Sequence, residues 1–108
     1  MRDNAKSGAL TEVTFFVLLA LYEPRHGYAI MQFIEEKTDG RLILGAGSLY
    51  GAMESLCKKG WIELHDDSDV RRKEYIITDL GRRIAKQELV RLREVARIAQ
   101  EITGGTAV

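Results

Sequence analysis

The sequence predicts a mainly α-helical protein with one small β-hairpin, of the α+β class. Apolar residues recur at helical spacing in four segments, and the pattern changes to strand-like alternation between residues 61 and 77. The chain has 108 residues, of which 45% are hydrophobic and 30% charged. That length suits a single domain with a hydrophobic core and requires no covalent cross-links.

The first two helices are predicted on either side of a sharp break. Thr11 can cap a helix that runs to about Tyr22 and is apolar on nearly all sides, which predicts a buried helix. Pro24 stops this helix, and Gly27 lets the chain turn. A second helix is predicted over 28–37, where apolar residues again recur at helical spacing.

The middle of the chain predicts a short strand and a third helix. Leu42, Ile43 and Leu44 form an apolar run that is too short for a helix, and we interpret it as a small strand. The third helix opens within 45–48 and ends at Lys59, before a glycine. Its inner face is predicted to consist of Leu49, Met53 and Leu56, with Ala52 beside them.

The last third of the chain predicts a hairpin and a long helix. Strands over 61–65 and 73–77 flank a polar tip, 66–70, which lacks the Asn-Gly or Asp-Gly pair of a tight turn. Thr78 then starts a helix that continues to about residue 103 and is roughly 35 Å long. A pair of glycines ends it.

This order of elements is typical of the winged helix-turn-helix, in which the third helix enters the DNA major groove and the ribbon contacts the backbone. We therefore expect a winged helix-turn-helix DNA-binding domain over 1–78. A C-terminal dimerisation helix over 79–103 would belong to the same compact unit, and 104–108 would form a disordered tail. Winged helices also serve as protein-interaction modules that do not bind DNA, so such a module is the alternative function.

The charge distribution is compatible with DNA binding although the net charge is zero. The chain holds 16 basic and 16 acidic side chains. Residues 71–100 carry nine basic and four acidic side chains, whereas 61–70 carry four acidic ones and no Lys or Arg. What matters for nucleic acid is where the charges lie, so a basic face can exist on a neutral protein.

The sequence gives no support to membrane, metal or enzyme functions. The apolar run 13–22 is shorter than the roughly 20 residues of a membrane span, and its flanks do not fit a cleaved signal. We therefore expect a cytoplasmic protein. The single Cys57 excludes an intrachain disulfide, and with two histidines it gives no basis for a metal site. Common enzyme motifs are missing, and Glu35 and Glu36 diverge as neighbours on a helix, so we expect neither catalysis nor a cofactor.

Four short segments stand in a characteristic order and spacing. They are His26-Gly27-Tyr28-Ala29-Ile30, Gly47-Ser48-Leu49-Tyr50, Leu56 with Lys59-Gly60-Trp61-Ile62-Glu63, and Arg71-Arg72-Lys73-Glu74-Tyr75-Ile76-Ile77-Thr78-Asp79-Leu80-Gly81. Together, over about residues 10–103, they resemble the PadR family of bacterial transcriptional regulators. The single terminal helix looks like that of the small subfamily. The resemblance implies a homodimeric repressor of pseudo-palindromic promoter DNA. The wing tip departs from the family pattern because it is rich in aspartate and has no glycine between Asp66 and Arg71.

The predicted DNA-binding residues lie on the third helix and on the second wing strand. On the outer face of the third helix they are Ser48, Tyr50, Gly51, Ser55 and Lys58. In the wing they are Arg71, Arg72 and Lys73, of which at most two can share one face of a strand. The alternatives are that Tyr50 packs on the wing, that Gly51 only tolerates crowding, and that the basic run is a solvated strand.

The terminal helix predicts a homodimer. One helix of this length has too little of its own domain to cover its apolar stripe, so part of the stripe should meet another subunit. The predicted interface consists of Phe15, Leu89, Leu92, Val95, Ala96, Ala99 and Ile102, with Ala85 in the same helix seam. Some members of the family release DNA when a flat hydrophobic compound binds between the subunits. Residues 79–108 contain no Phe, Trp or Tyr, so this helix cannot stack on such a compound, and we expect little binding in a central pore.

Five further residues receive structural interpretations. Tyr28, Trp61 and Tyr75 are expected to pack in the core or on the hairpin rather than to form a ligand cage. His26 is expected to have a local role at a helix start. Cys57 is interpreted as a small core residue.

Overall fold

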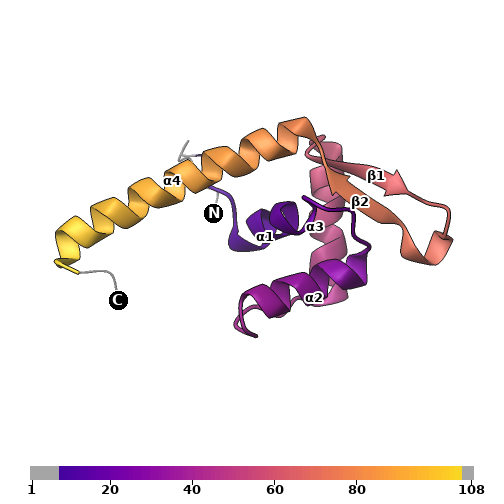
Figure 1. Cartoon of the computed structure of the whole chain (residues 1–108), viewed down its shortest axis with the longest axis horizontal. Coiled ribbons are helices and arrows are strands. Elements are labelled where there is room, and N and C mark those ends of the chain that lie inside the picture. Colours follow the sequence, from indigo (N-terminus) through magenta and orange to yellow (C-terminus); the bar gives the residue numbers. More distant parts are fainter. Residues whose placement is uncertain (1–7, 106–108) are drawn as a thin grey trace, which may run out of the picture.

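The computed structural model describes residues 8–105, which form four α-helices, a 3-10 turn and a two-stranded antiparallel hairpin (Figure 1). The elements are α1 (Glu12–Ala20), α2 (Gly27–Lys37), α3 (Ala46–Lys58), β1 (Ile62–Asp66), the turn Val70–Arg72, β2 (Glu74–Ile77) and α4 (Asp79–Thr103). The predicted fold class, a winged helix-turn-helix with a long C-terminal helix, is confirmed. Residues 106–108 of the predicted tail and residues 1–7 lie outside the described residues.

α1 is the central helix of the core. It lies between α4 on one side and α2 with α3 on the other (Figure 1). The Thr11 hydroxyl accepts a hydrogen bond from the Thr14 N–H at 3.1 Å, which gives α1 the predicted cap. Hydrophobic side chains from every helix and both strands meet around α1, and the fully buried ones include Val17, Leu18, Leu21, Ile30, Ile34, Leu49, Leu56 and Ile62.

The predicted strand at Leu42–Leu44 is wrong: this segment is an extended loop between α2 and α3. The Thr38 side chain bonds both backbone groups of Leu42, since its Oγ1 lies 3.1 Å from the Leu42 nitrogen and 3.4 Å from the Leu42 carbonyl oxygen. Leu42 and Leu44 pack against the core while Ile43 is exposed. The run is apolar because it seals the core, and it pairs with no strand.

The wing is joined to the start of α2. β1 and β2 pair with Ile62 opposite Ile77, and the register shifts between Leu64 and Asp66. The outer edge of β2 pairs with Arg25, just before α2, through two hydrogen bonds: Arg25 N to Tyr75 O at 3.1 Å and Tyr75 N to Arg25 O at 2.9 Å. This isolated bridge occupies the place where a third strand would lie, and it fixes the wing against the helices.

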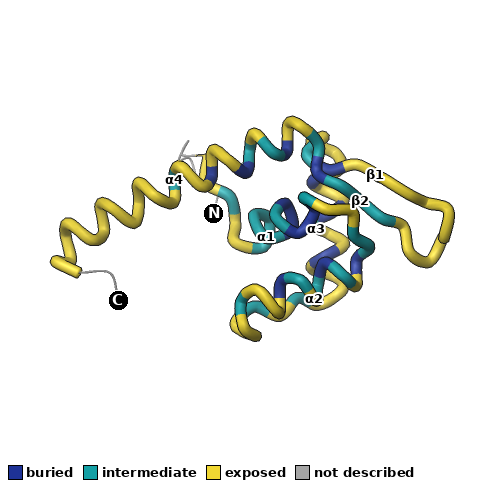
Figure 2. The backbone as a smooth tube through the Cα atoms, in the orientation of Figure 1, coloured by how far each residue is buried: buried dark blue, intermediate teal, exposed yellow. Residues whose placement is uncertain are grey.

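α4 packs on the body over its first turns and then extends beyond it. Gly81, Ala85 and Glu88 are buried, whereas every residue from Leu92 to Thr103 is exposed (Figure 2). Gly104 ends the helix in the left-handed conformation, with φ of 65°. In the part of the chain that the structure describes, no helix is long and apolar enough to cross a membrane.

Candidate nucleic-acid interface

The outer face of α3 is exposed to solvent. Leu49, Met53 and Leu56 are buried as predicted, which turns the opposite side of the helix to solvent. The exposed residues there include the predicted Ser48, Gly51, Ser55 and Lys58. A Cβ added at Gly51 would meet nothing within 4 Å, so this glycine does not relieve crowding within the chain. Because Gly51 has no side chain, this face of α3 can approach another surface closely.

Tyr50 lies apart from that face, over the start of α2. Its side chain is half exposed, and its ring rests so close to Gly27 that a Cβ at position 27 would lie 2.8 Å from Cζ of Tyr50. Tyr50 and Tyr75 of the wing also line a common hollow. This position agrees with the alternative interpretation, in which Tyr50 packs on the wing. Tyr50 therefore joins three elements, α2, α3 and the wing.

The basic run of the wing adopts a turn rather than a strand. Arg71 and Arg72 belong to the 3-10 turn, and Lys73 lies between this turn and β2. The predicted strand start at residue 73 is therefore one residue too early. The expectation that alternate side chains of this run point to opposite faces of a strand does not apply to a turn. The Asp69 carboxylate accepts a hydrogen bond from the Arg71 N–H at 3.0 Å and fixes the turn. All three basic side chains are exposed.

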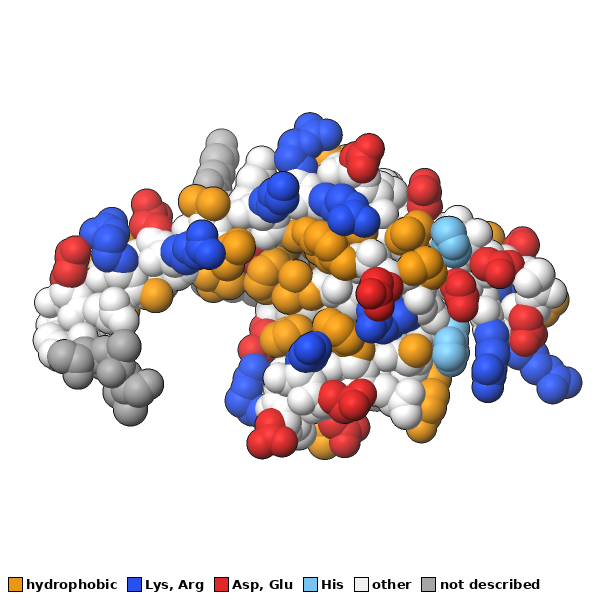
Figure 3. All heavy atoms as spheres, viewed as in Figure 1, with side chains coloured by type: hydrophobic (Ala, Val, Ile, Leu, Met, Phe, Trp, Pro, Cys, Tyr) orange, Lys and Arg blue, Asp and Glu red, His pale blue; other side chains and the backbone are white. Residues whose placement is uncertain are grey.

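The aspartates of the wing tip bond to their own backbone. The Asp66 carboxylate accepts a hydrogen bond from the Ser68 N–H at 2.8 Å, and this bond holds the pKa of Asp66 below its ordinary value. Within residues 8–105, no ion pair joins Asp66, Asp67 or Asp69 to Arg71 or Arg72. Basic side chains project from the lower edge of the wing in Figure 3, beside acidic ones. Both arginines thus remain available to an external anion.

The structure gathers only some of the predicted DNA-binding residues in one place. Tyr50, Arg71 and Lys73 line one cleft with the start of α2, whereas Arg72 does not line it. Ser48, Gly51 and Ser55 lie on the outer face of α3, whereas Lys58 also lines a second hollow with Tyr50 and Tyr75 of the wing. The cleft and the outer face of α3 adjoin each other at Tyr50, which precedes Gly51 in the helix.

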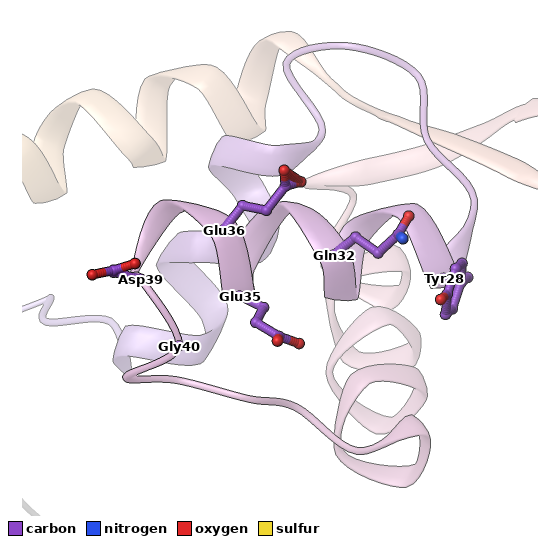
Figure 4. Close-up of a pocket in the computed structure, with 6 residues that line it drawn as sticks. All are labelled: Tyr28, Gln32, Glu35, Glu36, Asp39 and Gly40. Atoms are coloured by element: carbon purple, nitrogen blue, oxygen red, sulfur yellow. The ribbon is translucent and has the colours of Figure 1, made fainter.

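The outer side of α2 differs in charge from this region. A shallow hollow of about 620 Å³ is lined by Tyr28, Gln32, Glu35, Glu36, Asp39 and Gly40 (Figure 4). Its three carboxylates would repel phosphates, so this side of α2 is unsuitable for nucleic acid. Glu35 and Glu36 point in different directions in Figure 4, as predicted for adjacent helical residues.

The apolar stripe of α4 lies largely in solvent. Leu89, Leu92, Val95 and Ile98 are each exposed by 39–46%, and Ile102 by 80%. Ala96 and Ala99 are exposed between them, and Phe15 of α1 is half-buried. Ala85 does not belong to this surface, contrary to prediction, because it is buried against its own domain. The domain covers the first turns of α4, so the exposed part of the predicted seam begins at Leu89.

An ion pair between the buried Glu88 and the half-buried Arg91 lies where the covered part of α4 gives way to the exposed part. The Arg91 guanidinium donates to both carboxylate oxygens of Glu88, at 2.8 and 2.6 Å. The Leu10 N–H donates to the same carboxylate at 3.4 Å. The hydrogen bonds from Arg91 hold the pKa of Glu88 below its ordinary value, although burial acts in the opposite direction. Beside this pair is a hollow of about 330 Å³, whose apolar lining includes Leu10, Phe15, Phe16 and Leu92.

Comparison with known proteins decides the family. The family model described as "Transcriptional regulator PadR-like family" matches residues 17–87. The chain belongs to this family. PadR regulators are transcription factors and not enzymes, and membership implies that this chain binds DNA. No curated protein sequence matches the chain at a significant level.

Several solved structures are similar to this chain in fold. A transcriptional regulator from Clostridium thermocellum is 29% identical, with a TM-score of 0.75 over 82% of this chain and 87% of that one. A PadR family regulator from Eggerthella lenta is 24% identical, with a TM-score of 0.72 over 87% and 83% of the two chains. RosR of H. salinarum is 26% identical, with a TM-score of 0.66 over 89% and 96%.

Two of the residues that received a structural interpretation lie in positions that the sequence did not predict. Tyr28 is 61% exposed at the start of α2, so its expected packing role is wrong, whereas Trp61 and Tyr75 do pack against the core. Cys57 is exposed rather than a core residue, because it lies one step beyond the inner face of α3, and partial burial raises the pKa of its thiol. The contact between Gly27 and Tyr50 leaves no periodic signal, since the two residues are distant in sequence. No group of three or more metal-ligating side chains occurs within residues 8–105.

Proposed function

We propose that this PadR-family regulator is a homodimeric bacterial repressor that binds a pseudo-palindromic promoter site. The outer face of α3 would enter the major groove, with Ser48, Ser55 and Lys58 near base edges and phosphates. The observation that carries this proposal is the open face of α3, where nothing in the domain lies within 4 Å of a Cβ at Gly51. The exposed Arg71, Arg72 and Lys73 would hold the flanking backbone.

The exposed stripe of α4 supports the dimer. An apolar surface of this length, projecting beyond the domain, is typical of an interface rather than of solvent-exposed helix (Figure 2). The interface would consist of Leu89, Leu92, Val95, Ala96, Ala99 and Ile102, with Phe15 of the partner's α1. Residues 1–78 would bind the DNA, and residues 79–103 would form the dimer.

A small hydrophobic effector, if one releases the DNA, would find its aromatic contacts on α1 and α2 rather than on α4. An open hollow of about 500 Å³ is lined by Phe16, Leu19, Tyr22, Phe33 and Lys37. The Arg25 guanidinium lies 4.6 Å from the Phe33 ring centroid, and that of Arg82 lies 4.7 Å from the Tyr22 ring centroid. The lining is apolar apart from Lys37, so a small hydrophobic effector suits this surface.

Selection of bound sequences from random duplex DNA tests the proposal. A pseudo-palindrome with half-sites about one helical turn apart is the expected product. Placed over a promoter, the selected site should lower transcription in a purified system when the protein is added. Retention of duplex DNA should weaken steeply between low and moderate salt, because neutralised phosphates release counterions. A protein-interaction module would retain no duplex at low salt and would enrich no sequence.

A further inference from the structure

A carboxylate lies on the outer face of α3. The sequence of this helix, Ala46–Lys58, contains one acidic residue, Glu54. Gly51 precedes Glu54 by three residues and Lys58 follows it by four, and side chains at these spacings share one face of a helix. The Glu54 side chain is exposed. If this face of α3 meets DNA, it therefore brings a negative charge to a polyanion.

The Glu54 carboxylate is free to contact an external group. Within residues 8–105 no ion pair involves it, although Lys58 lies one turn away. Its neighbours Gly51 and Ser55 are smaller, and a Cβ at Gly51 would meet nothing within 4 Å. On the side of the wing, Glu54 borders a hollow of about 330 Å³. An approaching surface would meet this carboxylate before it meets Gly51 or Ser55.

The chemistry of a carboxylate favours one kind of base edge. Phosphates repel it, so Glu54 opposes any binding that depends on the DNA backbone alone. In the major groove, guanine and thymine present acceptor oxygens, which also repel a carboxylate. Adenine presents an amino group beside the acceptor N7, whereas cytosine presents its N4 amino group as a donor. Cytosine is therefore the base that best matches Glu54.

We propose that Glu54 determines sequence specificity by accepting a hydrogen bond from the N4 amino group of one cytosine in each half-site. The inference rests on the proposed entry of α3 into the major groove, and it adds the identity of a base. Glu54 lowers the affinity for duplexes that lack a cytosine at this position. It thereby separates the operator from other DNA, because specificity is a difference between two affinities.

Removal of the donor from the DNA and of the acceptor from the protein tests the contact. Selection with wild-type protein should enrich a cytosine at one position of each half-site. Replacing this cytosine by a 2-pyrimidinone nucleotide, which lacks the amino group, should weaken wild-type binding about tenfold. The same replacement should have little effect on Glu54→Ala, because the acceptor is already missing. Glu36→Ala is the matched control, since Glu36 is an exposed glutamate on the outer side of α2, and it should respond as wild type does.

Affinity for unrelated DNA gives a second measurement. Glu54→Gln keeps the size of the side chain and removes its charge. It should bind an unrelated duplex several times more tightly than wild type does, because the repulsion of phosphates is lost. Glu36→Gln should leave this affinity unchanged. Unchanged affinity of Glu54→Gln for the unrelated duplex would show that Glu54 stays away from the DNA, and it would overturn the inference.

The outcomes separate this inference from the proposed function. Wild-type protein that retains no duplex at low salt would overturn both. If wild type binds DNA and loses as much affinity as Glu54→Ala when the amino group is removed, only the role of Glu54 is overturned. Selection of a site without a cytosine preference that depends on Glu54 would have the same meaning. Thermal midpoints equal to that of wild type establish that these exposed substitutions leave the fold intact.

Discussion

Gly81 of α4 lies directly against the backbone of Trp61, at the point where the wing ends and the long helix begins. A Cβ at position 81 would be 3.0 Å from the carbonyl carbon of Trp61 and 2.7 Å from Cγ1 of Ile77. The same Trp61 carbonyl oxygen accepts the Thr78 N–H at 3.0 Å. The glycine therefore allows α4 to cross close to the wing, and this crossing sets the direction in which the exposed apolar stripe of α4 projects.

Gly81→Ala should destabilise the protein by about 3 kcal/mol, at the upper end of typical overpacking penalties, because the obstructing atoms include backbone that cannot move alone. Urea unfolding measures the change. Gly51→Ala is the control, since a Cβ there meets nothing, and it should stabilise α3 by up to about 1 kcal/mol. Equal stability of the Gly81 variant and wild type would contradict the close packing at this crossing.

Gly51→Glu should abolish binding to the selected site and leave the thermal midpoint nearly unchanged. The new side chain would project from the open face of α3 and bring a negative charge to the DNA. Fluorescence anisotropy with labelled duplex measures the affinity, and circular dichroism measures the midpoint. Normal affinity would show that this face of α3 stays away from the groove.

The wing arginines should contribute affinity without sequence preference. Changing both Arg71 and Arg72 to Ala should weaken the selected duplex and an unrelated one by similar factors. The slope of log K against log salt should fall by up to about 2 units per half-site, because each arginine neutralises about one phosphate. Titrations at four salt concentrations give both quantities. An unchanged slope would remove the wing from the interface.

Glu88 should make part of the stability depend on pH. Its pKa lies below the ordinary value of 4.5 in the folded protein, so its contribution is fully present above about pH 4.5 and is lost as the pH falls through the folded pKa. Glu88→Gln should be less stable than wild type at pH 7, because the buried side of Arg91 loses its charged partner. The difference between the two proteins, from urea unfolding, should shrink towards pH 3. A difference that is constant with pH would contradict the assignment.

The sequence predicted those elements whose apolar residues recur at a regular spacing. The buried faces of α1 and α3, the hairpin and the full extent of α4 follow from spacings of 3.6 and 2 residues, because burial of apolar surface forms these elements. The exposed side of α3 was predicted by the same logic, as the complement of Leu49, Met53 and Leu56.

The errors occur where the partner is distant in sequence. An apolar run such as Leu42–Leu44 looks the same whether it pairs with a strand or seals a core, and here Leu42 and Leu44 pack against the distant core. Ala85 fits the dimer seam by spacing, yet the body of the domain covers it. The cleft at the start of α2 depends on Gly27, Tyr50 and the wing meeting in space, which no local pattern encodes.

The exposed apolar stripe on α4 leads to a prediction about how two copies of the chain associate. The face that buries Gly81, Ala85 and Glu88 in its own domain continues without a break to Leu92 and Ala99, where the domain no longer covers it. A second copy of the chain, related by a two-fold axis, would cover this surface reciprocally. Val90 lies on the opposite side of the helix and is 65% exposed, so it provides a matched control.

Leu92→Glu should convert the dimer to a monomer and sharply reduce operator affinity, whereas Val90→Glu should do neither. Near the two-fold axis the substitution would bury two carboxylates without partners, at a cost of several kcal/mol across the interface. Operator binding depends on the dimer, because two copies of α3 must lie about one DNA turn apart at a fixed spacing. Sedimentation velocity at micromolar concentration measures the association. A Leu92→Glu dimer with normal affinity would place the interface elsewhere, and a monomeric wild type would refute binding to a palindrome by a preformed dimer.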